Sequence, residues 1–334
     1  MRKRVAAAAT RMAVVAWTAG LVVLLASLPA LAQTARPSWP ETLTIGTGSP
    51  GGTYHVYGAG LARLLTRELG LQVLTRPSEG PTENIKLLEA GEVQLAFVTL
   101  GVAQQGWNAS ADWTGGRQLR AMRAMFPMYD TPFQFLVKND APAQTIGDLA
   151  GRRVGIGPQG GTGGIYTPLI LKALKVETTL VPGTWSELAA GLSGGQLDAL
   201  IAVGGVPLPE VLDLDRRGAV RSLGLTPAQT VALRLALPEL AASTIAAGTY
   251  PSLRRHYQTV GVYNFAVAHS RLPDDLVYAI LEAVFAGNEE LMAAHPAAAE
   301  TVPANFTRNA VLPFHGGATR WFANKAATGV VRGD

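Results

Sequence analysis

A strand, a glycine-rich turn and a helix follow one another at two places in this chain. The turns Gly46–Gly51 and Gly155–Gly160 both have the spacing G-x-G-x-x-G, and each follows a short apolar run. A similar second helix–strand pair comes after each turn, over 89–98 and 193–203. One α/β plan is therefore predicted to occur twice. Because a helix N-terminus offers unpaired N–H groups and about half a positive charge, the two turns are expected to face one cleft and to hold an anion.

Hydrophobic periodicity and capping residues predict alternating strands and helices along most of the chain. The predicted strands are 42–45, 72–75, 93–99, 119–126, 133–138, 153–157, 198–203 and 259–268. The predicted helices are 53–69, 82–90 with Thr82 as its cap, 165–175, a helix opened by the capping box 184–187, a helix from Pro227, 274–294 and 317–327. Such alternation is typical of mostly parallel sheets, whose ligands bind beyond the carboxyl ends of the strands. Both glycine turns lie at such ends.

The first 32 residues have the pattern of a secretory signal. A basic start with Arg2, Lys3, Arg4 and Arg11 precedes an apolar run over 12–28, and Ala30-Leu-Ala32 fits a small-x-small cleavage site. An uncleaved membrane anchor is the competing interpretation, but the run is short for a span. We expect residues 1–32 to be a cleavable signal peptide, 33–41 a tether, and the mature protein to be periplasmic.

The signal also accounts for the basic balance of the chain. The sequence has 28 Lys and Arg against 24 Asp and Glu, and removing the four basic residues of the signal leaves 24 of each. A mature charge near zero gives no reason to expect nucleic acid as a partner. The absence of cysteine excludes disulfides, thiolate catalysis, cysteine–metal sites and a lipid-anchored export signal. A mature protein that is free of the membrane is therefore expected.

The motifs of common enzyme classes are incomplete. The five histidines lack metal-ligand spacing such as H-E-x-x-H, and Ser49 is not in a nucleophile elbow because Thr47 occupies the first glycine position. A dinucleotide site needs an acidic residue after the second strand, where this chain has Arg76. We therefore expect no catalytic residues, no metal and no cofactor.

Binding of a carboxylate needs no arginine in the glycine turns. Charge-assisted hydrogen bonds contribute about 1.5–3 kcal/mol each, and a helix terminus adds roughly 0.3–1 kcal/mol, so four or five such bonds can reach the ~8 kcal/mol of a micromolar site after ordering costs. Arg76 and Arg123 are candidates for a distal carboxylate. The turns can alternatively serve tight chain reversal and helix packing alone, with Thr53 as an ordinary cap, Tyr54 and Tyr57 as core aromatics and Gln104 in solvent.

The predicted ligand-binding residues lie in the two turns, at the starts of the following helices and at the ends of two buried strands. They are Ser49, Gly52, Thr53, Tyr54, Tyr57, Thr99, Gln104, Gly160, Gly161, Thr162, Gly163, Trp185, Gly204, Gly205 and Pro207. Of these, Gly161–Gly163 is expected to form a second anion nest, Trp185 to wall the cleft, and the Gly204–Pro207 group to form its floor.

Four stretches resemble the TAXI family of TRAP-transporter solute receptors. They are Thr44–Tyr54, Gly155–Gly163, Val203–Pro207 and Thr244–Pro251, in the family's order. The resemblance covers about residues 42–325. It implies a two-lobed α/β periplasmic binding protein fold of type II, in which each lobe is a mostly parallel sheet flanked by helices and two crossing strands join the lobes. It also implies capture of a small organic anion, such as glutamate, 2-oxoglutarate or a related carboxylate, by lobe closure. Delivery to TRAP membrane subunits through transient contact would follow.

The resemblance implies a lobe order along the chain and also has departures. Lobe 1 is expected at 42–135 and again at 259–334, with lobe 2 at 136–258. The family often has Gln-Ser-Asp where this chain has Thr99-Leu-Gly101, tyrosines near Gln104 and Gln105, and Gly-Ser-Gly-Thr where this chain has Gly160–Gly163. An exported nucleotide-binding enzyme, or a receptor that serves an ABC transporter or a sensor kinase, remains an alternative.

Overall fold

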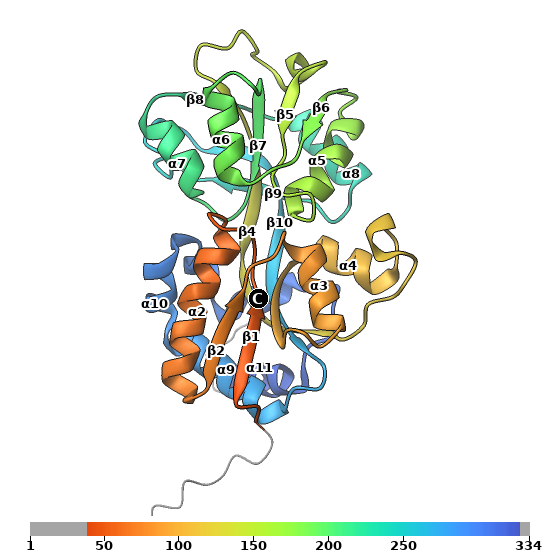
Figure 1. Ribbon diagram of the computed structural model, residues 1–334, viewed down its shortest axis with the longest axis vertical. Coiled ribbons are helices and arrows are strands. Elements are labelled where there is room, and N and C mark those ends of the chain that lie inside the picture. The colour runs from red at the N-terminus through yellow and green to blue at the C-terminus, as the bar shows by residue number, and fades with distance from the viewer. Residues whose placement is uncertain (1–38, 328–334) are drawn as a thin grey trace, which may run out of the picture. The chain divides into compact units, whose positions relative to one another are not determined.

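A ten-stranded sheet runs through residues 39–327, the part of the chain that the computed structural model describes (Figure 1). Its main path is β2-β1-β3-β10-β4-β7-β5-β6, while β8 pairs with β4 and β9 pairs with β10. The strands are β1 Thr42–Gly46, β2 Gln72–Arg76, β3 Leu95–Thr99, β4 Met122–Lys138, β5 Arg153–Gly155, β6 Thr179–Val181, β7 Ala199–Val203, β8 Val220–Leu223, β9 Ala241–Ile245 and β10 Tyr257–His269.

Helices flank this sheet in both halves of Figure 1. They are α2 Thr53–Leu69, α3 Pro81–Glu89, α4 Leu100–Asn108, α5 Thr162–Ala173, α6 Trp185–Ser193, α7 Pro209–Arg216, α8 Pro227–Ala236, α9 Asp274–Ala286, α10 Asn288–Ala294 and α11 Gly316–Ala327. Short 3-10 helices are η2 Asp112–Thr114, η3 Ile146–Leu149, η4 Pro296–Glu300 and η5 Pro303–Arg308. None of the helices within 39–327 has the length and apolarity that crossing a bilayer requires.

Two long antiparallel strands connect two parallel sets of strands. The set β2-β1-β3 is parallel, and so is β7-β5-β6. β4 pairs with β10 as far as Pro132 and then with β7 from Phe133, while β10 pairs with both β3 and β9. We call the half that contains β1–β3 lobe 1 and the half that contains β5–β7 lobe 2. The predicted two-lobed α/β fold with two crossing strands is therefore confirmed.

The inner strand of each lobe is buried along its whole length. Every residue of β3 and of β7 is buried. Continuous apolar runs were the sequence signal for these strands, because a parallel strand covered by helices on both faces has no solvent side. These strands therefore run through the core of each lobe, and their carboxyl ends lead towards the boundary between the lobes.

Three predicted elements differ from the structure. The strands predicted at 119–126 and 133–138 form one strand, β4, whose Pro127 lies where the pairing with β10 shifts register, a position that tolerates the missing N–H. The helix predicted at 274–294 breaks at Gly287, where a Cβ would lie 2.5 Å from Leu64. Thr82 does not cap α3, whose N-cap is Gly80. The Thr82 hydroxyl instead donates to the Gly160 carbonyl of lobe 2.

Some predictions lie outside what the structure describes. The signal peptide at 1–32 and most of the tether at 33–41 fall before residue 39, the first described residue. The lobe boundaries at 135/136 and 258/259 fall inside β4 and β10 and stay predictions.

Candidate functional site

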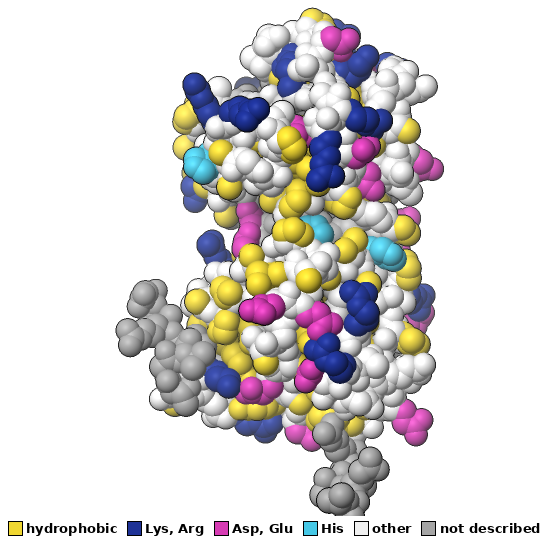
Figure 2. Space-filling view, turned by 90° about the vertical axis from the view of Figure 1, so that its left-hand side faces the viewer, with side chains coloured by type: hydrophobic (Ala, Val, Ile, Leu, Met, Phe, Trp, Pro, Cys, Tyr) yellow, Lys and Arg dark blue, Asp and Glu magenta, His cyan; other side chains and the backbone are white. Residues whose placement is uncertain are grey.

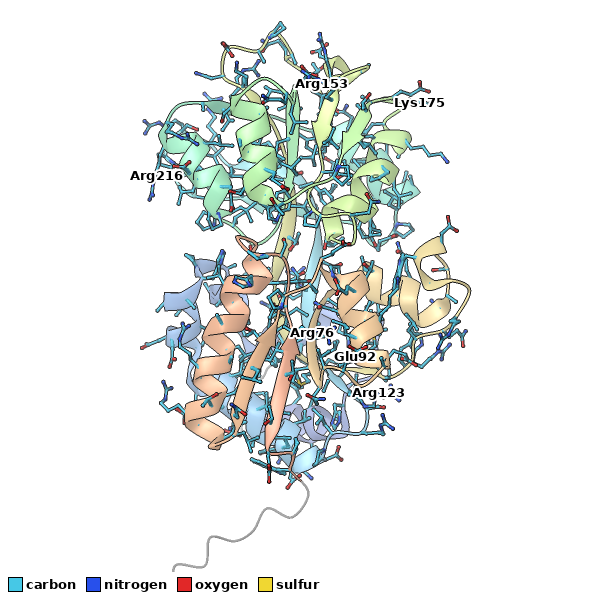
Figure 3. The ribbon with its side chains drawn as sticks, viewed as in Figure 1. Arg76, Glu92, Arg123, Arg153, Lys175 and Arg216 are labelled. Carbon is cyan, nitrogen blue, oxygen red and sulfur yellow. The ribbon has the colours of Figure 1, made fainter. Side chains whose placement is uncertain are left out.

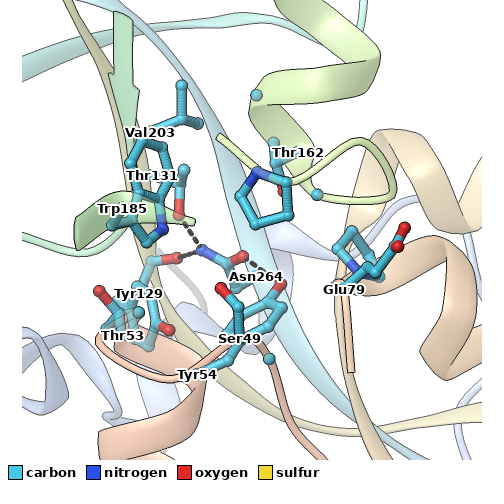
Figure 4. Close-up of a pocket in the computed structure, with 18 residues that line it drawn as sticks. Ser49, Thr53, Tyr54, Glu79, Tyr129, Thr131, Thr162, Trp185, Val203 and Asn264 are labelled. Atoms are coloured by element: carbon cyan, nitrogen blue, oxygen red, sulfur yellow. Dashed lines mark hydrogen bonds between the residues drawn. The ribbon is translucent and has the colours of Figure 1, made fainter. Parts of the chain in front are cut away.

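A small cavity lies where the two glycine turns meet, and its volume is about 60 Å³ (Figure 4). Both lobes and both crossing strands contribute to its wall. The lining residues are Gly48, Ser49, Gly52, Thr53, Tyr54, Glu79, Gly80, Pro81, Tyr129, Thr131, Pro158, Gly161, Thr162, Gly163, Trp185, Val203, Gly204 and Asn264. A space of this size admits a small metabolite rather than a nucleotide.

The N-termini of α2 and α5 reach this cavity from opposite lobes. α2 has Gly52 as its N-cap and α5 has Gly161, and neither cap supplies a side chain to the backbone N–H groups that follow. The first N–H groups of a helix have no partner within the helix, so both ends present backbone donors and the positive end of a helix dipole. The predicted pair of facing helix ends is confirmed by this geometry. α5 starts at Thr162, three residues before its predicted start.

Asn264 of β10 fixes the polar groups on the lobe 1 side of the cavity. Its Oδ1 accepts a hydrogen bond from the Tyr54 hydroxyl at 2.6 Å, and its Nδ2 donates to the Tyr129 carbonyl and to Thr131 Oγ1, each at 2.6 Å (Figure 4). Burial raises the pKa of Tyr54 well above its ordinary value, so the phenol stays neutral. The amide therefore keeps Tyr54 and Thr131 in fixed positions.

At least three side-chain donors in the wall keep a free proton, and one of them is the Tyr129 hydroxyl, which is buried without a hydrogen-bond partner in the described chain. Trp185 is only 5% exposed, and its indole N–H has no hydrogen-bond partner within residues 39–327. Figure 4 draws the ring nitrogen on the side of Thr131 and Asn264. Thr131 is 3% exposed and accepts from Asn264, so its own proton is available for a further acceptor. These groups can donate to an anion in the cavity.

Hydrogen bonds across the boundary hold the lobes together next to the cavity. Thr53 Oγ1 of lobe 1 donates to the Gly205 carbonyl of lobe 2 at 3.0 Å. Thr82 Oγ1 donates to the Gly160 carbonyl at 2.9 Å, and the Gly160 N–H donates to Glu79 Oε2 at 3.2 Å. The second glycine turn is thus clamped onto the start of α3.

The wall of the cavity carries little charge. Glu79 is the one charged residue among the lining residues, and they include neither lysine nor arginine. Arg76 pairs with Glu92 at 2.7 Å. Arg123 donates to the carbonyls of Arg120 and Met122 and lies over the Trp107 ring, so neither predicted arginine lines the site (Figure 3). On the face shown in Figure 2, basic and acidic side chains are interspersed.

Nine of the fifteen predicted site residues line the cavity. They are Ser49, Gly52, Thr53, Tyr54, Gly161, Thr162, Gly163, Trp185 and Gly204. Gly160 and Gly205 lie just behind the wall, where they accept the bonds that join the lobes. Pro207 does not line the cavity, because the chain leaves the wall after Gly204.

Three further predicted residues, Tyr57, Thr99 and Gln104, do not line the cavity. Tyr57 is fully buried, and its hydroxyl bonds to Thr301 at 3.0 Å, so it belongs to the core of lobe 1. Thr99 is also fully buried, and its hydroxyl oxygen accepts a hydrogen bond from the Thr162 hydroxyl at 3.4 Å, behind the wall. Gln104 lies on the solvent face of α4.

The sequence reasoning missed nine lining residues. They are Gly48, Glu79, Gly80, Pro81, Tyr129, Thr131, Pro158, Val203 and Asn264. Asn264 had a detectable signal, because it is a polar residue within the mostly apolar run 260–268 of β10, and buried polar residues are usually satisfied or functional. Tyr129 and Thr131 follow from the crossing of β4, which the sequence divided into two strands. Within 39–327, no three His, Cys, Asp or Glu side chains are grouped to hold a metal ion.

Comparison with protein families gives one match that spans most of the chain. The sequence pattern of the NMT1-like family matches residues 45–325. This range includes both glycine turns, both crossing strands and every residue that lines the cavity.

Solved structures share this fold at low sequence identity. MatC from Rhodopseudomonas palustris, solved with bound malate, has a TM-score of 0.57 at 16% identity, over 84% of this chain and 98% of that one. The periplasmic binding protein BugD has a TM-score of 0.54 at 15% identity, over 88% and 99%. A second R. palustris protein, solved with adipate, has a TM-score of 0.52 at 18% identity, over 88% and 99%. These similarities establish the two-lobed fold of periplasmic binding proteins.

Proposed function

This chain belongs to the NMT1-like family, and we propose that it is an extracytoplasmic solute-binding protein that captures a small organic anion between its lobes. The observation that carries the proposal is the pair of helix N-termini, α2 and α5, that meet at one buried cavity from opposite lobes. Backbone N–H groups and a dipole at both ends favour a carboxylate without a positively charged side chain.

The ligand class we propose is that of glutamate, 2-oxoglutarate and related carboxylates. The four stretches that resemble TAXI receptors support this class, and so do the malate and adipate in two proteins of the same fold. Ligand-induced closure would add the contacts of Gly161–Gly163 to those of Thr53 and Tyr54 and remove the ligand from water. Residues 1–32 would direct the protein to the periplasm, and TRAP membrane subunits would receive the ligand through a transient contact.

Calorimetry on the purified full chain tests this function. We expect a small carboxylate to bind at micromolar or tighter concentration, without being chemically changed. Thr53→Val removes the lobe-bridging hydroxyl at nearly constant volume, so we expect about tenfold weaker binding, whereas Thr53→Ser retains the hydroxyl and the affinity. Binding of uncharged compounds alone, or turnover of a bound nucleotide, would contradict the proposal.

The membrane partner is tested separately. Reconstituted TRAP subunits are expected to take up the bound solute only when this protein is present. Uptake through an ABC transporter in the same assay would identify the alternative partner.

A further inference from the structure

The wall of the cavity is rich in hydrogen-bond donors but contains no cation. Its donors are the backbone N–H groups at Thr53 and Tyr54, those at Thr162 and Gly163, and the indole of Trp185. The Thr131 hydroxyl adds a further proton. Two unpartnered side chains are an independent sign of a ligand: Trp185 is 5% exposed and its indole has no partner in residues 39–327, and the Tyr129 hydroxyl is buried without one. A buried polar group without a partner is costly unless something in the cavity bonds to it.

Among the described residues that line the cavity, the one charged side chain is negative, and a second carboxylate lies close to the first glycine turn. Glu79 lines the cavity, and Glu210 of α7 lies behind it, where its Oε1 would be within 2.4 Å of a Cβ on Gly51. Glu210 Oε2 is buried without a hydrogen-bond partner in the described chain. One carboxylate can be neutralised by the two helix ends, but a second would meet these carboxylates with no arginine or lysine in the wall to offset them.

Acceptors for a ligand ammonium are also scarce. Asn264 Oδ1 is occupied by Tyr54, and the Tyr129 carbonyl accepts from Asn264. Glu79 is exposed and already accepts the Gly160 N–H at the boundary between the lobes. An ammonium would bring three donors to a wall whose helix ends also present donors, and whose remaining acceptors are hydroxyl oxygens and the exposed Glu79 carboxylate.

From this distribution we infer that the ligand is a small monocarboxylate, with one carboxylate held by the α2 and α5 termini and by Trp185, and with an uncharged body. The body would lie against the apolar side chains of the wall, among them Pro81, Pro158 and Val203. This inference rests on the proposed capture of an organic anion between the lobes. Among the related carboxylates it favours monocarboxylates over glutamate and 2-oxoglutarate.

Matched ligand pairs test the inference on the purified full chain by calorimetry. Each pair differs by one group: 2-oxopentanoate against 2-oxoglutarate, butanoate against succinate, and 2-oxopentanoate against 2-aminopentanoate. We expect 2-oxopentanoate and butanoate, the members with no second charged group, to bind at least about tenfold more tightly than their partners, because the second carboxylate or the ammonium finds no partner in the wall.

Variants assign the preference to named residues. Trp185→Phe removes the free indole donor and should weaken monocarboxylate binding by about tenfold or more. Trp113→Phe is the matched control, because the Trp113 indole bonds to Gln105 away from the cavity, and it should leave the affinity unchanged. Glu79→Gln retains an acceptor for Gly160 and should raise dicarboxylate affinity about threefold more than monocarboxylate affinity.

The outcomes separate this inference from the proposed function. Tighter binding of the dicarboxylate or the amino acid would overturn the inference and leave an anion receptor standing. An unchanged affinity in Trp185→Phe would remove the role of the indole and overturn the inference as stated. Failure of every anion to bind would overturn both.

Discussion

At the scale of single residues, Asn264 organises the site without being free to bind the ligand. Both of its amide protons and its carbonyl oxygen are used within the protein. Its role is to direct the hydroxyls of Tyr54 and Thr131. A polar residue in a buried strand therefore acts on the ligand through its neighbours.

Removing the Tyr54 hydroxyl is expected to affect both stability and binding. In Tyr54→Phe, the Oδ1 of buried Asn264 loses its partner, which should lower the free energy of unfolding by about 1–3 kcal/mol and weaken ligand binding. Denaturant unfolding and calorimetry check the two effects. Tyr278→Phe, on α9 and away from the cavity, is the control. Equal behaviour of the two variants would show that the bond to Asn264 contributes little.

His295 is expected to make stability depend on pH. Burial lowers its pKa from 6.5 to about 4. The unfolded chain therefore takes up this proton first, so stability is complete above pH 6.5 and decreases as the pH falls from 6.5 towards 4, by about 3 kcal/mol. In His295→Asn, an amide oxygen can replace Nδ1 as acceptor for the Ala297 N–H, and this part of the pH dependence should disappear. An unchanged slope of unfolding free energy against pH would contradict the assignment.

At the scale of elements, α6 shows how a local signal places a functional side chain. The Thr184 hydroxyl accepts the Glu187 N–H at 3.3 Å, and the Glu187 carboxylate accepts the Thr184 N–H at 2.9 Å. This capping box was predicted from the sequence and is confirmed. Because α6 begins at Trp185, the cap also sets where the free indole lies.

Loss of this cap should therefore cost more than helix stability. Thr184→Ala should lower the free energy of unfolding by about 1 kcal/mol and also weaken ligand binding, because the position of Trp185 is released. Urea unfolding followed by Trp fluorescence and calorimetry measure both, and Thr184→Ser should restore both. Full ligand affinity in the alanine variant would show that the indole is positioned by tertiary packing alone.

The predictability of the elements and of the site follows from the range of the interactions involved. Helix α2 was predicted with both bounds correct, because its start and its Gly70 stop are local signals. The unity of β4 was missed, since pairing with β10, more than 120 residues away, is what allows a strand to continue through Pro127. The glycine turns and the segments that follow them predicted half of the residues that line the cavity. Tyr129 and Thr131 remained hidden because only the strand crossing brings them there.

At the scale of the whole molecule, contact between the lobes depends on the absence of side chains at their boundary. A Cβ on Gly205 would lie 2.8 Å from Thr53 and Tyr129 and 2.9 Å from Ala297, all of lobe 1. A Cβ at these distances would push the lobes apart, because the atoms it meets are not the far ends of flexible side chains that could move aside. Closure therefore has a strict steric requirement at this point.

Gly205→Ala is expected to hold the lobes apart. We expect weaker ligand binding, by at least about tenfold, and a larger radius of gyration in small-angle scattering with ligand present. Gly224→Ala is the control, because a Cβ there meets nothing within 4 Å. Scattering profiles that coincide for the two variants would show that the boundary adapts to an added methyl group.

The clamp between Gly80 and the second glycine turn also has a consequence for specificity. A Cβ on Gly80 would lie 2.9 Å from the Gly161 Cα, so main chain touches main chain there, beside the bonds that Thr82 and Glu79 make to Gly160. The groups that read a solute, such as Trp185 and Thr131, sit elsewhere in the wall. The main-chain contact that joins the lobes is thus made by other atoms than those of Trp185 and Thr131, which face the ligand. A receptor redesigned for another metabolite can therefore change the side chains that face the ligand and keep the main-chain contact between the lobes.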